Sequence, residues 1–114
     1  ESDPIDPRGV RRIVFCSGKV YFDLLKTRRA EGIADVALVR IEQLYPFPAR
    51  EYGTVLARYP REASLVWCQE EPKNMGPWTF VEPNIEWVLV QNKAKFPRAR
   101  FVGRAARRPQ VRRE

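Results

Sequence analysis

The chain has 114 residues, of which 44% are hydrophobic and 11% aromatic, and it carries a formal net charge of +7. This length predicts one domain that buries roughly two-thirds of the surface its unfolded chain would expose. No apolar run approaches the ~20 residues of a membrane span, and no signal-peptide pattern is present. The sequence has no histidine, which disfavours catalytic triads and the usual zinc sites. We therefore expect one soluble domain, or a piece of a larger soluble protein.

The positive charge is concentrated at the end of the chain. Residues 98–114 contain seven arginines and one glutamate, which leaves residues 1–97 with a net charge of only +1. No aromatic residue follows Phe101 among these arginines, so base stacking is not indicated and only non-specific phosphate contact would be expected. We predict a solvated basic tail at residues 107–114, and we do not expect nucleic acid to be a partner.

Strand and helix signals alternate along the first half of the chain. Residues 1–11, in which two prolines and a glycine lie among five charged residues, resemble a linker remnant. Residues 12–16 form a short apolar run that predicts a strand, and a helix is predicted from Val20 until Gly32 stops it. Residues 36–41 are almost all apolar, as expected for a strand covered on both faces.

The second half repeats the alternation. Pro48 suits the first turn of a helix that Pro60 ends. A third strand is predicted at residues 64–69 and a third helix over residues 80–89, in which Pro83 is tolerable only near the start. A short fourth strand is predicted at residues 100–103. Strands separated by helices predict a mostly parallel sheet with helices on both faces.

We therefore predict an α/β domain at residues 12–106, with a three-layer α/β/α arrangement and strand order 2-1-3-4. In this order the first and third strands are neighbours, so the segments after them open into the same crevice at the carboxyl edge of the sheet. The first of these segments is Ser17-Gly18-Lys19, and the second is the acidic loop, defined as residues 69–77.

Lys19 falls in the first turn of a predicted helix, where a cation opposes the helix dipole at a cost of ~0.3–1 kcal/mol. Two kinds of partner could offset this cost, and the sequence does not decide between them. One is an ion pair with Glu70 or Glu71 across the crevice, which would tie the two loops together. The other is an anionic ligand held by Ser17, Gly18 and Lys19. The Ser-Gly-Lys triplet lacks the glycine spacing of a P-loop, and consecutive glutamates leaving a strand point to opposite faces, which disfavours a shared catalytic role.

Cysteine and tryptophan fit structural roles. Cys16 and Cys68 both lie in apolar segments, and we interpret them as small core residues rather than a disulfide or a metal site. Trp67, Trp78 and Trp87 are expected in the core or at an interface, and Trp78 is the preferred interface candidate because it follows a loop.

Three segments carry a resemblance to a known family. They begin at Phe15-Cys16-Ser17-Gly18-Lys19-Val20-Tyr21, at Asp35-Val36-Ala37-Leu38-Val39-Arg40-Ile41 and at Trp67-Cys68-Gln69-Glu70-Glu71-Pro72-Lys73-Asn74-Met75-Gly76. Their order and spacing resemble the C-terminal domain of the thiamine-diphosphate-dependent 2-oxoglutarate dehydrogenase, the decarboxylating component of its multienzyme complex. The resemblance covers roughly residues 8–106 and implies a transketolase-type C-terminal fold.

The resemblance implies that the parent enzyme is an oxidoreductase of the tricarboxylic acid cycle, which uses thiamine diphosphate and Mg²⁺ and passes a succinyl group to the lipoyl acyltransferase of the complex. Its catalytic and cofactor-binding domains precede the C-terminal domain. We therefore expect no catalytic residue, cofactor or metal site in this chain and predict that it is inactive alone. Bacterial cytoplasm or the mitochondrial matrix would be its compartment.

For this domain the resemblance implies homodimer packing and, in some family members, allosteric binding of acetyl-CoA or a nucleotide such as AMP. That implication gives Ser17, Gly18, Lys19 and Arg104 interest as anion contacts. Glu70, Glu71, Asn74 and Gly76 would form the structural loop tie. The family usually continues into a further helix after Ala106, so we expect a domain truncated at its C-terminus.

Two alternatives stay open. The chain would be a free-standing α/β module that holds an anion or nucleotide, or it would be the same domain of a related 2-oxoadipate dehydrogenase.

Overall fold

Four short strands form one parallel sheet. The computed structural model describes residues 5–42 and 47–103. The strands are β1 (Arg12–Cys16), β2 (Val36–Arg40), β3 (Ser64–Cys68) and β4 (Arg100–Val102), and all of their pairings are parallel. The order across the sheet is β2-β1-β3-β4, so the predicted order 2-1-3-4 is confirmed.

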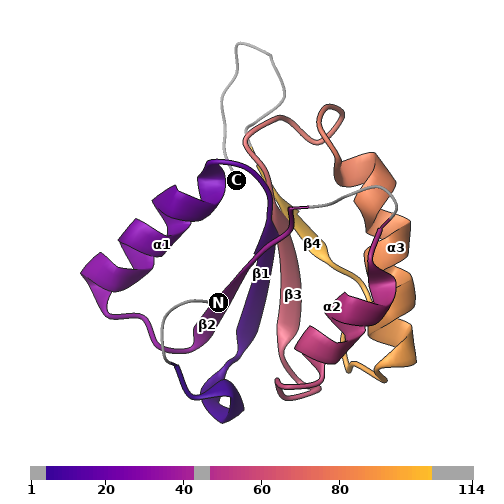
Figure 1. Cartoon of the computed structure of the whole chain (residues 1–114), viewed down its shortest axis with the longest axis horizontal. Helices are drawn as coiled ribbons and strands as arrows, with labels where there is room; N and C mark the ends of the chain where they lie inside the picture. Colours follow the sequence, from indigo (N-terminus) through magenta and orange to yellow (C-terminus); the bar gives the residue numbers. More distant parts are fainter. Residues whose placement is uncertain (1–4, 43–46, 104–114) are drawn as a thin grey trace.

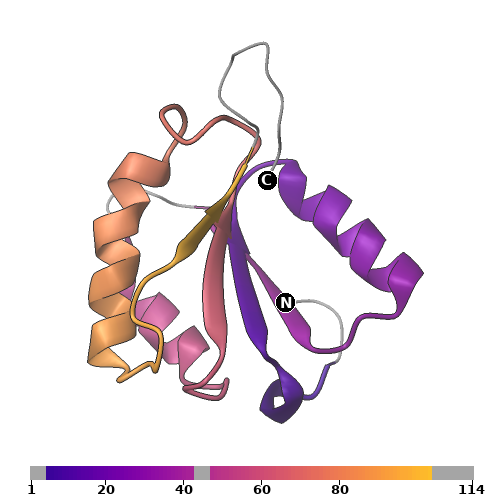
Figure 2. The ribbon, with the colours of Figure 1, turned by 180° about the vertical axis from the view of Figure 1, so that it is seen from behind.

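The helices cover both faces of the sheet, which confirms the three-layer α/β/α prediction. Figure 1 shows α1 (Val20–Glu31) on one side and both α2 (Ala49–Leu56) and α3 (Trp78–Gln91) on the other. Figure 2 shows the same layers from behind, with the edge strand β4 toward the viewer. Gly32 ends α1 in the left-handed conformation, with φ of 65°, as the sequence predicts for a glycine at this position.

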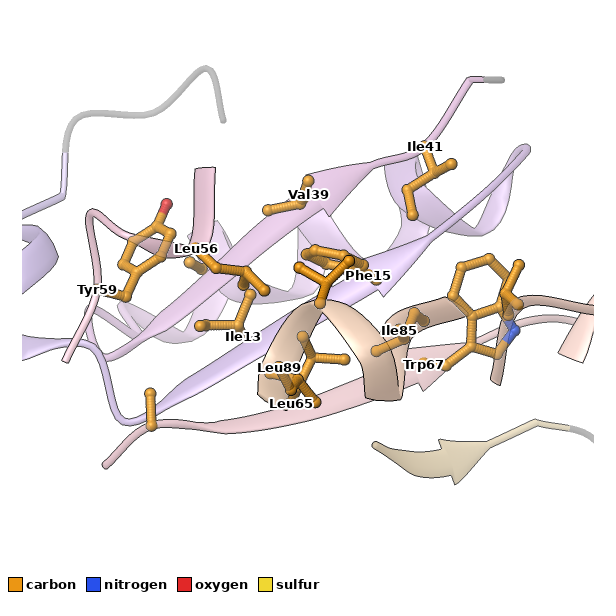
Figure 3. Packing of buried hydrophobic residues seen from close by; sticks show 14 of the residues in the cluster. Ile13, Phe15, Val39, Ile41, Leu56, Tyr59, Leu65, Trp67, Ile85 and Leu89 are labelled. Atoms are coloured by element: carbon orange, nitrogen blue, oxygen red, sulfur yellow. The ribbon is translucent and has the colours of Figure 1, made fainter. Parts of the chain in front are cut away.

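The larger core lies between the sheet and the pair of helices α2 and α3. Alternate strand residues point into it, among them Phe15 and Trp67, which are 1% and 0% exposed. Ile85 and Leu89 from α3 close it from the other side (Figure 3). Each large side chain buried in this way contributes ~1.5–3 kcal/mol relative to its exposed state, so this face supplies most of the apolar stabilisation.

The smaller core lies between the sheet and α1. It contains the strand residues that point to the α1 face of the sheet, including Val14 and Val66, together with Tyr21 and Leu25 from α1. Arg28 of α1 is also buried, at 4% exposure, and its Nη1 donates a hydrogen bond of 3.0 Å to the backbone oxygen of Val36. The charged end of this arginine is therefore tied to β2 inside an otherwise apolar layer.

Some element boundaries differ from the prediction. The segment expected to be a linker contains a short 3-10 helix, η1 (Pro7–Gly9), and Val10 just after it is 2% exposed. The core therefore begins before β1, although the domain boundaries themselves stay a prediction. The helix α3 begins at Trp78, so Pro83 lies in its second turn rather than its first. The predicted basic tail and the predicted C-terminal truncation both lie outside the described residues.

Candidate functional site at the carboxyl edge of the sheet

The register of the sheet places two loops side by side at its carboxyl edge. Cys16 and Cys68 end β1 and β3, and the two residues are direct register partners. Neighbouring strands lie ~4.8 Å apart, so the Ser17-Gly18-Lys19 turn and the acidic loop leave the sheet from adjacent positions. The two segments therefore begin side by side where the strand order reverses, while the crevice between them stays a prediction.

The Ser17-Gly18-Lys19 turn is open to solvent. Gly18 has a positive φ of 75°, a conformation that strains residues with a Cβ. Lys19 occupies the N-cap position of α1 and makes no capping hydrogen bond through its side chain. The N–H groups of Tyr21 and Phe22 donate to the carbonyls of Gly18 and Lys19, at 3.4 and 3.0 Å. These two donors are thus used within the turn, and an anion would depend mainly on side-chain cations.

A second cation stands beside this turn. Arg40 ends β2 and is the register partner of Cys16. Its guanidinium lies 5.0 Å from the ring centroid of Phe22 and 6.0 Å from that of Tyr21. It also lies 3.8 Å from a carboxylate oxygen of Glu42 in an exposed ion pair. Arg40 was not predicted as a site residue because it is the last residue of an apolar strand. The aromatic pair Tyr21-Phe22 at the start of the preceding helix, α1, is the signal that points to it.

The acidic loop is organised by a buried glutamine. Gln69 is only 3% exposed, and its Oε1 accepts a hydrogen bond of 2.8 Å from the indole N–H of Trp67. Its Nε2 donates to the backbone oxygens of Pro72 and Met75, at 2.9 and 2.7 Å, with a longer contact of 3.3 Å to the oxygen of Glu71. One amide group therefore satisfies several backbone groups of the loop and fixes its path.

Two glycines let the loop pack tightly. A Cβ on Gly76, whose φ is 71°, would lie 2.8 Å from Oε1 of Glu71. A Cβ on Gly103 would lie 2.7 Å from the backbone oxygen of Glu71 and 2.5 Å from the ring of Phe101. The backbone N–H of Gln69 donates to the oxygen of Val102, so the acidic loop and the end of β4 form one closely packed unit.

The ion pair predicted to tie the two loops together is not formed among the described residues. Glu70, Glu71, Asn74 and Gly76 all lie in the acidic loop, and their side chains or backbone are exposed. Within residues 5–42 and 47–103, no ion pair joins Lys19 to either glutamate. The tie between the two loops stays a prediction, whereas the hydrogen bonds that organise the acidic loop come from Gln69. Sequence reasoning missed Gln69 because glutamine is mostly exposed in proteins.

Both thiols at this edge are buried and free. Burial, with a smaller contribution from the nearby Cys68, raises the pKa of Cys16 to about 12, and the positive charge of Arg40 partly opposes this rise. Burial also raises the pKa of Cys68. Because the thiolate is the nucleophilic form, neither cysteine is suited to covalent catalysis at neutral pH. The interpretation of both as core residues is confirmed.

Two further predicted residues need comment. Trp78 is 4% exposed and packs against Phe101 with ring centroids 5.4 Å apart, so its assignment to an interface is wrong. It begins α3 with its side chain turned into the core, which its position after a loop did not reveal. The exposed tryptophan is Trp87, at 58%. Arg104, the fourth candidate anion contact, lies outside the described residues.

Searches of the described residues find neither a cluster of metal-ligating side chains nor a helix long and apolar enough to cross a membrane. The carboxyl edge therefore presents two exposed cations beside an open turn, and a loop fixed by a buried amide. This arrangement can bind an anion or pack against another surface, and it offers no evident acid–base pair.

Comparison with known proteins identifies the family. A model described as the 2-oxoglutarate dehydrogenase C-terminal family matches residues 1–110. The 2-oxoglutarate dehydrogenase E1 components of Brucella anthropi and Brucella ovis are each 57% identical to the chain over 97 residues. The match covers 85% of this chain but only 10% of each relative. The chain thus belongs to the 2-oxoglutarate dehydrogenase C-terminal family and spans about a tenth of the length of the E1 components that it matches.

Proposed function

We propose that the chain works as the C-terminal structural domain of a 2-oxoglutarate dehydrogenase E1 component, where it supports dimer packing and does not catalyse the reaction itself. The observation that carries this proposal is the family match across residues 1–110. The acidic loop supports it, because the buried amide of Gln69 hydrogen-bonds the indole of Trp67 and the loop backbone and so has a structural role.

In this proposal the parent protein binds thiamine diphosphate and Mg²⁺ in domains outside this chain and transfers a succinyl group to the lipoyl acyltransferase of the complex. It would act in the bacterial cytoplasm or the mitochondrial matrix. Both Brucella relatives are 2-oxoglutarate dehydrogenase E1 components, which favours this substrate over 2-oxoadipate. The family match also makes a free-standing module the less favoured alternative.

The test is a domain exchange. The matched region of the Brucella ovis E1 component would be replaced by residues 1–110 of this chain, and a second version would lack the region altogether. We expect the exchanged protein to keep its dimeric mass and most of its dehydrogenase activity, and the shortened protein to lose both. A shortened protein that remains a fully active dimer would contradict the proposed role.

We also propose that the Ser17-Gly18-Lys19 turn holds an anion such as acetyl-CoA or AMP as an allosteric ligand of the same domain. The observation that favours it is the pair of exposed cations, Lys19 and Arg40, beside a helix start with no side-chain cap. Arg104 would be a further contact. Phe22 offers an exposed ring against which Arg40 already packs.

Calorimetric titration of the chain with acetyl-CoA and AMP tests this second role. Lys19→Ala is expected to weaken binding by roughly tenfold, since a charged contact of ~1.5 kcal/mol is lost. Lys26→Ala, an exposed lysine farther along the same helix, is the matched control and should leave the affinity unchanged. Absence of heat with the unmodified chain, or an equal loss in both variants, would rule the site out.

A further inference from the structure

A second groove lies at the opposite, amino-terminal edge of the sheet. It has a volume of about 1,210 Å³ and is lined by residues from the entry to each strand: 8–12 before β1, 33, 35 and 36 before β2, 60 and 62–64 before β3, and 96–98 and 100 before β4. The segments come from all four strand entries, so the groove runs across the sheet edge. It is separate from the two loops of the carboxyl edge.

Arginines dominate the charge of this groove. Five arginines line it, against the two carboxylates of Asp35 and Glu62. Arg8 and Arg98 are already engaged in exposed ion pairs, with Asp6 at 3.2 Å and with Glu86 at 4.0 Å.

The other three lining arginines are Arg11, Arg12 and Arg100. All are exposed, and within the described part of the chain none of them takes part in an ion pair. The groove therefore retains an excess of uncompensated positive charge.

Two of the unpaired arginines project from the same sheet face. Arg12 is two residues before Val14, which belongs to the core beneath α1. Arg100 precedes Phe101, which packs against the opposite core, so alternation places Arg100 on the α1 face as well. Only β3 separates their strands, and Arg12 is paired with Ser64 whereas Arg100 is paired with Val66. The two backbone positions are therefore roughly 12 Å apart. This spacing suits two carboxylates on an extended chain better than one small anion.

The rest of the lining indicates what kind of anion fits. The exposed ring of Phe96 and the partly exposed side chains of Ile33 and Val36 add apolar surface. The two carboxylates would repel the continuous phosphates of a nucleic acid. A volume of about 1,210 Å³ exceeds the ~300–1,000 Å³ typical of small-ligand pockets. Small ligands of open α/β sheets also bind at the carboxyl edge rather than here.

We propose that this amino-edge groove binds an acidic polypeptide segment with interspersed apolar residues, with Arg12 and Arg100 contacting its carboxylates and Phe96 its apolar side chains. The proposal does not depend on the anion site of the carboxyl edge.

The test uses the 114-residue chain and a fluorescein-labelled peptide in which pairs of glutamates alternate with single leucines or phenylalanines. Fluorescence anisotropy measures the affinity. The double variant Arg12→Gln/Arg100→Gln should weaken binding by roughly tenfold, as expected for two lost exposed charge contacts of ~0.7 kcal/mol each. The matched control Arg50→Gln/Arg58→Gln removes the same charge from exposed arginines of α2 and the turn after it, and it should change the affinity by less than about twofold.

A second pair of variants tests the apolar contact without changing the charge of the chain. Phe96→Ser should weaken binding, whereas Phe22→Ser should not, because Phe22 is exposed to a similar degree, 53% against 47%, but lies at the other edge. A peptide with glutamine in place of glutamate should bind much more weakly. Equal losses in the two arginine variants would overturn the proposal, since binding would then reflect net charge or the basic tail. Tighter binding of a single-stranded oligonucleotide, weakened by the same groove variant, would overturn it in favour of a nucleic-acid site.

Discussion

The two loops at the carboxyl edge start from neighbouring residues but are stabilised in opposite ways. The acidic loop is fixed by the buried amide of Gln69, which bonds Trp67 and the loop carbonyls. The Ser17-Gly18-Lys19 turn has an exposed lysine at a helix start and no side-chain cap. The acidic loop is therefore stabilised by its own hydrogen bonds, whereas the Ser17-Gly18-Lys19 turn is less stable because it exposes a cation at a helix start.

The largest expected effect comes from removing the amide of the acidic loop. Gln69→Leu would leave the indole N–H of Trp67 and the carbonyls of Pro72 and Met75 without their partner, at ~1–3 kcal/mol for each buried group that water cannot reach. We expect a loss of ~3 kcal/mol in the free energy of unfolding, measured by urea denaturation. Gln91→Leu, at an exposed position of α3, is the control and should change stability by less than ~0.5 kcal/mol. A tolerated Gln69→Leu would show that the loop is held by other contacts.

A smaller loss is expected from Gly76→Ala. The new Cβ would sit at φ of 71° and 2.8 Å from a carboxylate oxygen of Glu71. Because the carboxylate of Glu71 can move away, the loss of stability comes from the backbone strain of ~1–2 kcal/mol. Adding Glu71→Ala should therefore not restore the stability of Gly76→Ala. Thermal denaturation followed by circular dichroism measures the change. Gly9→Ala, where nothing lies within 4 Å of the new Cβ, should leave the melting temperature unchanged or slightly higher.

A mutation in the Ser17-Gly18-Lys19 turn is expected to increase the stability of the chain, whereas the two mutations in the acidic loop decrease it. Lys19→Ala removes a cation from the start of α1 and should stabilise the chain by ~0.3–1 kcal/mol at low salt, because the cation opposes the helix dipole. The gain should shrink as salt is added. Lys26→Ala, in the middle of α1, is the control. A destabilising Lys19→Ala would indicate that the lysine has a partner inside the domain, such as the predicted ion pair with Glu70 or Glu71.

The last expected effect appears only at alkaline pH and concerns the thiol of Cys16, at the end of β1. Burial raises the pKa of Cys16 from its ordinary value of 9.0 to about 12, so the folded chain keeps a proton that the unfolded chain loses above pH 9. Stability from this group is therefore complete below pH 9 and is lost as the pH rises toward 12. Urea denaturation at pH 8 and pH 10.5 should show a smaller pH-dependent loss in Cys16→Ala than in the unmodified chain. An identical loss in both proteins would mean that the thiol of Cys16 ionises in the folded state as it does in the unfolded state.

Comparison of prediction and structure shows which residues carry local information. The apolar run of β1, the helical spacing after Val20 and the stop at Gly32 define their elements through short-range sterics and periodicity. The order of the strands also followed, because right-handed crossovers leave few arrangements. Trp78 and Gln69 were misjudged or missed, since their burial depends on residues that are distant in the sequence, such as Phe101 and Val102.

The residues alone predict the alternation of strands and helices, the sheet order, the family and the two neighbouring loops at the carboxyl edge. Those features depend on local backbone preferences and on the spacing of apolar residues. Three features became visible only in the folded domain: a buried amide organises the acidic loop, Arg40 lies near the open turn, and five arginines line one groove at the amino edge. Each of these depends on which strands are neighbours and which face a side chain takes, and packing of the whole sheet sets both.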